Sequence, residues 1–122
     1  MDERRALRVG EAIREELTEI IGFEMEDPRL REVDVTAVQV SPDSRHATVK
    51  IAIRGEEREQ NQTLAVLNNA AGFLRRELAP RLLLRHMPEL HFERHKNPDA
   101  DSRIDFLIRR AKKSRARDEK QP

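Results

Sequence analysis

Apolar residues recur at helical spacing near the beginning of the chain, between residues 4 and 25. The positions between them are rich in glutamate, so the segment has one apolar stripe and a charged remainder, as in a helix that covers a core. Pro28 disfavours helical geometry in the residue before it, and the side chain of Asp27 favours a turn. We therefore expect a long first helix that ends near Asp27, followed by a turn at residues 27–30. The apolar stripe consists of Ala6, Val9, Ile13, Leu17, Ile20 and Ile21.

Two segments with the composition and alternation of β-strands follow, at residues 33–41 and 47–54. The first is rich in β-branched residues, but its apolar positions change phase after Ala37, which indicates a β-bulge or burial on both faces. The second alternates between apolar and polar residues, as in a strand with one buried face. Pro42 and Asp43, between the two segments, are typical turn residues. The pattern predicts a β-hairpin.

A second amphipathic helical pattern runs from Gln62 to Leu84 and has a glycine, Gly72, near its centre. Glycine costs about 1 kcal/mol relative to alanine inside a helix. We therefore expect the chain to bend at this glycine or to bring another backbone close to it. Beyond the bend, a third helix should run from about Phe73 to Leu84, with Pro80 bending its axis. The expected interhelical kink consists of Ala70, Ala71 and Gly72.

A short third strand is indicated at residues 89–95, where Leu90 and Phe92 alternate with polar residues. Residues 101–117 have apolar positions that fit a terminal helix. The order of elements is therefore helix, strand, strand, helix, bend, helix, strand. This order predicts an α+β domain in which helices cover one face of a three-stranded sheet and leave the other face relatively polar.

The length and composition of the chain exclude several classes of protein. A chain of 122 residues supports one domain, which we expect to span residues 1–110, with a basic, flexible tail at residues 111–122. The absence of cysteine excludes disulfides and thiolate metal sites. No segment approaches the roughly 20 apolar residues of a membrane span, and the polar start is unlike a signal peptide. We therefore expect a cytoplasmic protein with no membrane association.

The net charge of +1 conceals two halves of opposite sign. Residues 1–60 carry 10 Lys+Arg against 15 Asp+Glu, a net of −5, whereas residues 61–122 carry 14 against 8, a net of +6. This asymmetry fits one anionic and one cationic face, the latter suited to phosphates. The candidate RNA-binding residues are Arg75, Arg76, Arg81 and Arg85 after the kink, and Arg109, Arg110, Lys112 and Lys113 near the end of the chain.

Each of these features also has an interpretation without RNA. The arginines after the kink fit a solvated helix face, the basic tail fits a flexible segment, and Gly72 fits a purely geometric role between helices. The sequence leaves both interpretations open. With four Phe and no Tyr or Trp, the chain lacks the exposed aromatic pair that stacks bases in many RNA-binding sheets, which favours recognition of phosphates and shape.

No constellation of catalytic or metal-binding residues stands out. The acidic row on the first helix is typical of a solvated surface rather than of a catalytic pair. His91 and His95 are four residues apart, but in a strand this spacing spans about 13 Å, too far for shared ligation of one ion. The sequence contains neither a phosphate-binding loop motif nor a nucleophile motif. We expect no enzyme, cofactor, metal site or small-molecule substrate.

The order of elements and four short motifs resemble the bacterial, type II arrangement of the K-homology fold and, within it, the ribosome-binding factor A family. The resemblance extends from about Arg8 to Ile108. In that family a kink of Ala, any residue, Gly replaces the GXXG loop by which the usual K-homology module grips four nucleotides. The motifs are DPRL at residues 27–30, VSPDSRHATVKI at residues 40–51, AAGFLR at residues 70–75 and PELHF at residues 88–92.

The resemblance implies a monomeric factor that binds free 30S ribosomal subunits through 16S rRNA and supports late subunit maturation and 16S rRNA processing. The first turn of the third helix, with its free N–H groups and with Arg75 and Arg76, would then face a phosphate. Two other hypotheses stay open. The net charge of −5 in the first half fits an adaptor that docks on a ribosomal protein or an assembly GTPase, and the basic tail fits a generic nucleic-acid chaperone.

Overall fold

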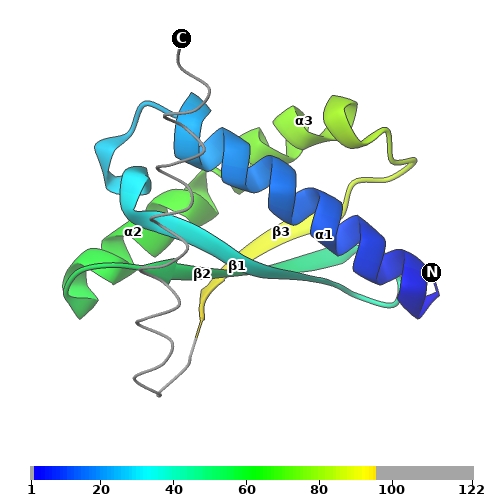
Figure 1. Ribbon diagram of the computed structural model, residues 1–122, viewed down its shortest axis with the longest axis horizontal. Helices are drawn as coiled ribbons and strands as arrows, with labels where there is room; N and C mark the ends of the chain where they lie inside the picture. Colours follow the sequence, from blue (N-terminus) through cyan, green and yellow to red (C-terminus); the bar gives the residue numbers. More distant parts are fainter. Residues whose placement is uncertain (1, 96–122) are drawn as a thin grey trace, which may run out of the picture.

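The structure is a computed structural model that describes residues 2–95, which form three α-helices and a three-stranded sheet (Figure 1). α1 (Glu3–Glu19) begins after Asp2, whose carboxylate caps the helix by accepting a hydrogen bond from the Arg5 N–H at 2.7 Å. The chain continues as a wider, π-helical segment, η1 (Ile20–Glu24), and then as a 3₁₀ turn, η2 (Pro28–Glu32). The predicted first helix and the turn after it are confirmed.

The predicted hairpin is also present, formed by β1 (Val33–Val40) and β2 (His46–Ile53). The two strands pair in antiparallel fashion, and their register shifts between Val35 and Ala37. The change of phase in the sequence therefore marks a real irregularity of the strand, as expected of a bulge.

The carboxylates of two aspartates stabilise the two turns predicted from the sequence. The Asp27 carboxylate accepts a hydrogen bond from the Arg29 N–H at 3.0 Å, and the Arg29 guanidinium, which also donates to it, lowers the pKa of this carboxyl group. The Asp43 carboxylate accepts hydrogen bonds from the Ser41 hydroxyl at 2.6 Å and the Arg45 N–H at 3.0 Å, and these two donors lower its pKa. Both turns thus rest on charge-assisted bonds between near neighbours in the chain.

The third strand, β3 (Glu89–Arg94), lies beside β2 and runs parallel to it, so that the strand order is β1-β2-β3. A parallel neighbour needs a crossover connection, which α2 (Glu57–Asn69) and α3 (Ala71–Leu82) provide. The existence of the strand was predicted, but its direction was not. Alternation of apolar and polar residues is the same in a parallel and an antiparallel strand.

A single core joins the three helices to one face of the sheet. In β2 and β3 the alternate residues Ala47, Val49, Leu90 and Phe92 are buried, whereas their neighbours are exposed or half-buried on the opposite face. The expected polar face is therefore confirmed. The fully or almost fully buried apolar residues are Val9, Ile13, Leu17, Ile20, Ile21, Leu30, Val33, Val35, Ala47, Val49, Ile51, Leu67, Leu74, Leu78, Leu90 and Phe92.

Several boundaries differ from the predicted ones. α2 begins at Glu57, before the start of the apolar pattern, and α3 begins at Ala71 and ends at Leu82. Pro80 lies inside α3, which ends soon after it. The predicted terminal helix at residues 101–117 and the predicted tail at residues 111–122 lie outside the described residues. Within the described residues, none of the helices has the length and apolar character needed to cross a membrane.

Candidate nucleic-acid interface

The joint between α2 and α3 is a single residue, Ala70, with φ −89° and ψ 1°. Its N–H donates to the carbonyl oxygens of Val66 and Leu67, and its carbonyl accepts the first hydrogen bond of α3, from Leu74, at 2.9 Å. Ala70 supplies no side-chain acceptor for the first N–H groups of α3. These groups point out of the helix start, where an anion is favourable.

Gly72 lies inside the first turn of α3, two residues beyond the joint. A Cβ atom on Gly72 would meet only the Arg76 Nη1 atom, at 3.7 Å, which is an ordinary contact. The expectation that this glycine bends the chain or brings another backbone close is therefore wrong. The bend falls at Ala70, because the backbone of that residue, not of the glycine, leaves the helical conformation.

The close approach occurs at a different glycine, Gly10 in α1. A Cβ atom on Gly10 would lie 2.6 Å from the Val38 carbonyl oxygen of β1. Gly10 stands on the apolar stripe of the first helix, a position that could have indicated this contact between helix and sheet.

Four arginines from distant parts of the chain line one hollow of about 560 Å³, which we call the arginine hollow. Its volume lies within the range of about 300–1,000 Å³ that is typical of ligand sites. Two carboxylates, of Asp43 and Glu89, face the same hollow, which leaves a formal net charge of +2. The arginines are Arg5, Arg45, Arg75 and Arg85.

A smaller hollow of about 340 Å³ adjoins the joint between the helices, and we call it the joint hollow. Its wall includes Gly72 of α3 and His91 of β3, and it shares Arg75 and Glu89 with the arginine hollow. Arg75 is fixed there by a hydrogen bond that its Nη2 atom donates to the Met87 carbonyl oxygen at 2.7 Å. A guanidinium has five N–H donors, so this bond orients Arg75 and leaves donors for an anion.

The other predicted arginines have different surroundings. Arg81 donates to the two carboxylate oxygens of Glu24 at 2.8 and 2.6 Å, and the carboxylates of Glu16 and Glu77 lie 3.6 and 3.7 Å away. The hydrogen bonds to Glu24 raise the pKa of Arg81 and lower that of Glu24. Arg81 therefore ties α3 to η1 and α1. Arg76 is exposed on α3.

The remaining basic candidates, Arg109, Arg110, Lys112 and Lys113, lie outside the described residues. The structure adds Arg5 and Arg45 to the predicted set. No local pattern marks these two residues in the sequence, because only the fold brings the start of α1 and the hairpin turn next to α3.

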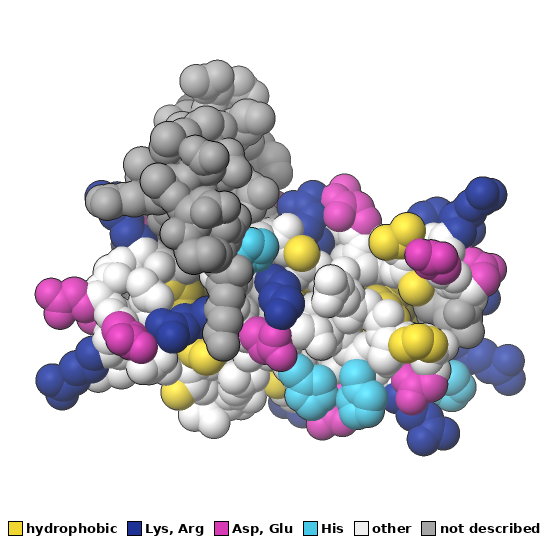
Figure 2. Space-filling model, turned by 90° about the horizontal axis from the view of Figure 1, so that it is seen from below, with side chains coloured by type: hydrophobic (Ala, Val, Ile, Leu, Met, Phe, Trp, Pro, Cys, Tyr) yellow, Lys and Arg dark blue, Asp and Glu magenta, His cyan; other side chains and the backbone are white. Residues whose placement is uncertain are grey.

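The acidic row of α1 is partly used within the molecule. The Glu11 carboxylate accepts hydrogen bonds from the Arg14 guanidinium, and Glu16 lies near Arg81. On the face shown in Figure 2, basic and acidic side chains of the described residues are mixed. That face is therefore not the purely anionic or cationic one that the charge asymmetry of the sequence suggested.

The sequence matches the family model for ribosome-binding factor A over residues 5–108. Ribosome-binding factor A of Solibacter usitatus is 67% identical over 119 residues, which cover 98% of this chain and 97% of the relative. That of Thermomicrobium roseum is 44% identical over 98% of this chain and 92% of the relative. The likeness thus spans almost the whole length of both chains in each comparison.

Solved structures with the same fold agree with this match. A crystal structure of ribosome-binding factor A from Thermus thermophilus has 28% identity and a TM-score of 0.59, covering 77% of this chain and 97% of that chain. A Thermus thermophilus homology model fitted into a cryo-EM map of a 30S–RbfA complex has 32% identity and a TM-score of 0.59, covering 72% and 92%. The chain described here belongs to the ribosome-binding factor A family.

Proposed function

We propose that this protein binds free 30S ribosomal subunits and supports their late maturation and 16S rRNA processing, acting in the cytoplasm as a monomer. The observation that carries the proposal is the family match over nearly the whole chain, together with the Thermus thermophilus relative that has been fitted into a 30S complex. The protein acts by binding rather than by catalysis, in keeping with the description of the family as a binding factor.

The proposed contact with rRNA lies across the arginine hollow and the joint hollow. Both hollows include Arg75, whose guanidinium is already oriented by Met87, and bidentate binding of phosphate is a particular property of arginine. The uncapped first turn of α3 lies beside them and adds N–H donors. Several donors of different chain segments thus converge on one place where a phosphate can sit.

Gly72 supports the same position for the contact with rRNA. The fold gives no steric reason for a glycine there, because a Cβ atom would have room, although glycine in a helix costs about 0.5–1 kcal/mol. Gly72 also lines the joint hollow. A residue without a side chain lets an RNA backbone approach the N–H groups of α3 closely, which explains a glycine that the protein itself does not need.

The mode of recognition is contact with phosphate and shape. The residues that line the two hollows are charged, polar or aliphatic apart from histidine, so they offer no phenylalanine on which bases stack. The basic residues Lys112 and Lys113 would add attraction that does not depend on sequence. Replacing both lysines by glutamine should therefore weaken binding to all RNA sequences alike.

The test compares two double variants in sedimentation with purified 30S subunits. Arg75→Gln with Arg76→Gln removes the Arg75 charge, which lines both hollows, and the Arg76 charge next to Gly72. Arg54→Gln with Arg58→Gln removes two exposed charges that line neither hollow. We expect the first pair to weaken binding roughly tenfold or more and to lower the slope of log affinity against log salt by about 1.5. The second pair should leave both quantities near the wild-type values.

Equal effects of the two double variants would overturn the placement of the contact. Binding that does not depend on salt would overturn recognition of phosphate altogether. In that case crosslinking on the subunit would identify the contact, and crosslinks to ribosomal proteins alone would favour an adaptor. Absence of the protein from free 30S subunits in cell extracts would overturn the proposed function itself.

A further inference from the structure

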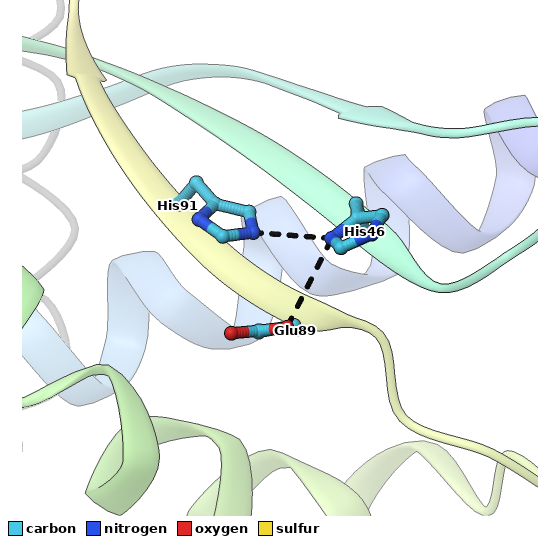
Figure 3. Close-up of side chains that lie close together, drawn as sticks. All are labelled: His46, Glu89 and His91. Atoms are coloured by element: carbon cyan, nitrogen blue, oxygen red, sulfur yellow. Dashed lines mark hydrogen bonds and ion pairs between the residues drawn. The ribbon is translucent and has the colours of Figure 1, made fainter.

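Two histidines and a glutamate meet on the polar face of the sheet (Figure 3). His46 stands at the start of β2, and Glu89 and His91 stand at the start of β3, all three exposed. The His46 Nδ1 atom lies 3.2 Å from the His91 Nε2 atom and 3.9 Å from the Glu89 Oε2 atom. One ligand atom from each residue lies within 4.8 Å of the other two.

The strand pairing brings these side chains together. β2 and β3 are parallel, His46 is opposite Glu89, and His91 is two residues further along β3, so the three side chains project from the same face. In the sequence His46 and His91 are 45 residues apart, and no spacing motif links them. The prediction that His91 and His95 do not share an ion is compatible with this cluster, because His95 instead contacts the Thr36 hydroxyl at 3.0 Å.

Backbone hydrogen bonds fix the positions from which the three side chains extend. The His46 N–H donates to the Ser41 hydroxyl at 3.0 Å, and the Ser41 N–H donates to the His46 carbonyl oxygen at 2.8 Å. The Glu89 N–H donates to the Arg45 carbonyl oxygen at 2.8 Å. The ends of both strands are therefore anchored to the hairpin turn, so folding has already brought together the backbone positions that carry the three side chains.

We propose that His46, His91 and Glu89 bind a divalent transition-metal ion of the zinc class. Two imidazole nitrogens and one carboxylate oxygen are a common zinc ligand set, with water in the fourth position. At Zn–N distances of about 2.0–2.1 Å, two ligand nitrogens of a tetrahedral site lie about 3.4 Å apart. The separation of 3.2 Å between His46 and His91 is close to this value, and small rotations of exposed side chains bring Glu89 into range.

A bound ion changes the charge next to the proposed rRNA contact. Glu89 lines both hollows, and His91 lines the joint hollow. With neutral imidazoles, the three side chains carry a charge of −1, and a bound Zn²⁺ changes this to +1. The metal would thus neutralise a carboxylate that repels phosphate, and it would link the starts of the neighbouring strands β2 and β3.

The test is isothermal titration of ZnCl₂ into the full-length protein without a histidine tag and without RNA. We expect one equivalent of Zn²⁺ to bind. His46→Gln and His91→Gln should each weaken binding by about tenfold or more, because even loss of an outer-shell partner costs roughly 10–100-fold in metal affinity. Glu89→Gln should weaken it less, since an amide oxygen is a poorer but still available ligand. In NMR spectra, Zn²⁺ should shift the imidazole signals of His46 and His91 first.

His95→Gln is the matched control, because His95 follows the same strand but contacts Thr36 and not the cluster. His86→Gln is a second control, for a histidine of the arginine hollow. Both variants should bind Zn²⁺ as the wild-type protein does. Absence of one-to-one binding, or equal losses in the cluster and control variants, would overturn the site. Because no RNA is present, neither result bears on the proposed binding to 30S subunits.

Discussion

Gly10 and Gly72 both lie inside helices, but only Gly10 is required by its surroundings. The space for a Cβ atom at Gly10 is taken by the Val38 carbonyl oxygen at 2.6 Å, whereas the nearest atom at Gly72 is the end of a flexible side chain at 3.7 Å. Two arginines of α3 differ in a similar way. Arg81 is bound by carboxylates of α1, η1 and α3, while Arg75 faces two hollows.

This comparison distinguishes residues that stabilise the fold through internal contacts from residues that remain free to contact an external partner. Along α1, small and charged side chains make internal contacts, so their identity follows from packing and ion pairing. At the start of α3, the glycine and the arginines have no comparable internal use among the described residues beyond the bond from Arg75 to Met87. Residues that cost stability without an internal contact are the ones for which an external partner is the better explanation.

Gly10→Ala should have the largest effect on stability. The new methyl group would overlap the Val38 carbonyl oxygen, so α1 must move away from β1, at a cost of about 1–3 kcal/mol. The free energy of unfolding, measured by urea denaturation, should fall by this amount. A variant as stable as the wild-type protein would show that α1 and β1 pack less tightly than indicated by the distance of 2.6 Å between the added Cβ atom and the Val38 carbonyl oxygen.

Gly72→Ala should act in the opposite direction on stability. Its methyl group has space, and alanine favours the helix by up to about 1 kcal/mol, partly by restricting the unfolded chain. We expect a higher free energy of unfolding together with weaker binding to 30S subunits, since the methyl group would stand between RNA and α3. Tight binding by the stabilised variant would contradict a close approach of RNA at this residue.

The elements that could be predicted from the sequence are those with a local signal. The stripe of α1, the irregularity of β1 and the alternation of β3 all follow from spacing along the chain. The start of α2 was missed because its first turn, Glu57–Glu59, is exposed and has no apolar periodicity, although glutamate favours the helix start electrostatically. The direction of β3 could not be predicted either.

The candidate site was predictable only in part, for the same reason. Arg75, Arg76 and Arg85 stand near the kink in the sequence, so a local pattern identified them. Arg5, Arg45 and the pair of His46 and His91 reach their places through tertiary contacts, which leave no periodic signal in the chain. Local patterns thus predicted the arginines near the kink, whereas only the fold shows that Arg5 and Arg45 line the same hollow as Arg75 and Arg85.

Leu83→Gly tests a position where the backbone favours glycine but the sequence has leucine. Leu83 directly follows the last residue of α3 as its C-cap, with φ 52°, and is 87% exposed. A left-handed conformation costs an L-residue about 1–2 kcal/mol, and glycine avoids this cost but loses part of the gain to its more flexible unfolded chain. We expect a net stabilisation of about 0.5 kcal/mol in urea denaturation. A loss of stability would show that the leucine side chain makes a contact that its exposure does not reveal.

Arg81→Gln should have the smallest effect, and its size depends on pH. The Arg81 hydrogen bonds lower the pKa of Glu24 below its ordinary value of 4.5, so the ionised pair stabilises the fold above that value. This contribution is lost as the pH falls through the lowered pKa in the folded protein.

The variant should therefore be slightly less stable than the wild-type protein at pH 7, and the difference should shrink as Glu24 becomes protonated at acid pH. Because both side chains reach solvent, the difference is expected to be small and to weaken with added salt. Urea denaturation of both proteins between about pH 7 and pH 3 measures it, with Arg76→Gln as the control from the same helix, since no ion pair of Arg76 is seen among the described residues. A difference that does not change with pH would mean that Arg81 stabilises the fold through packing of its aliphatic stem rather than through its ion pair with Glu24.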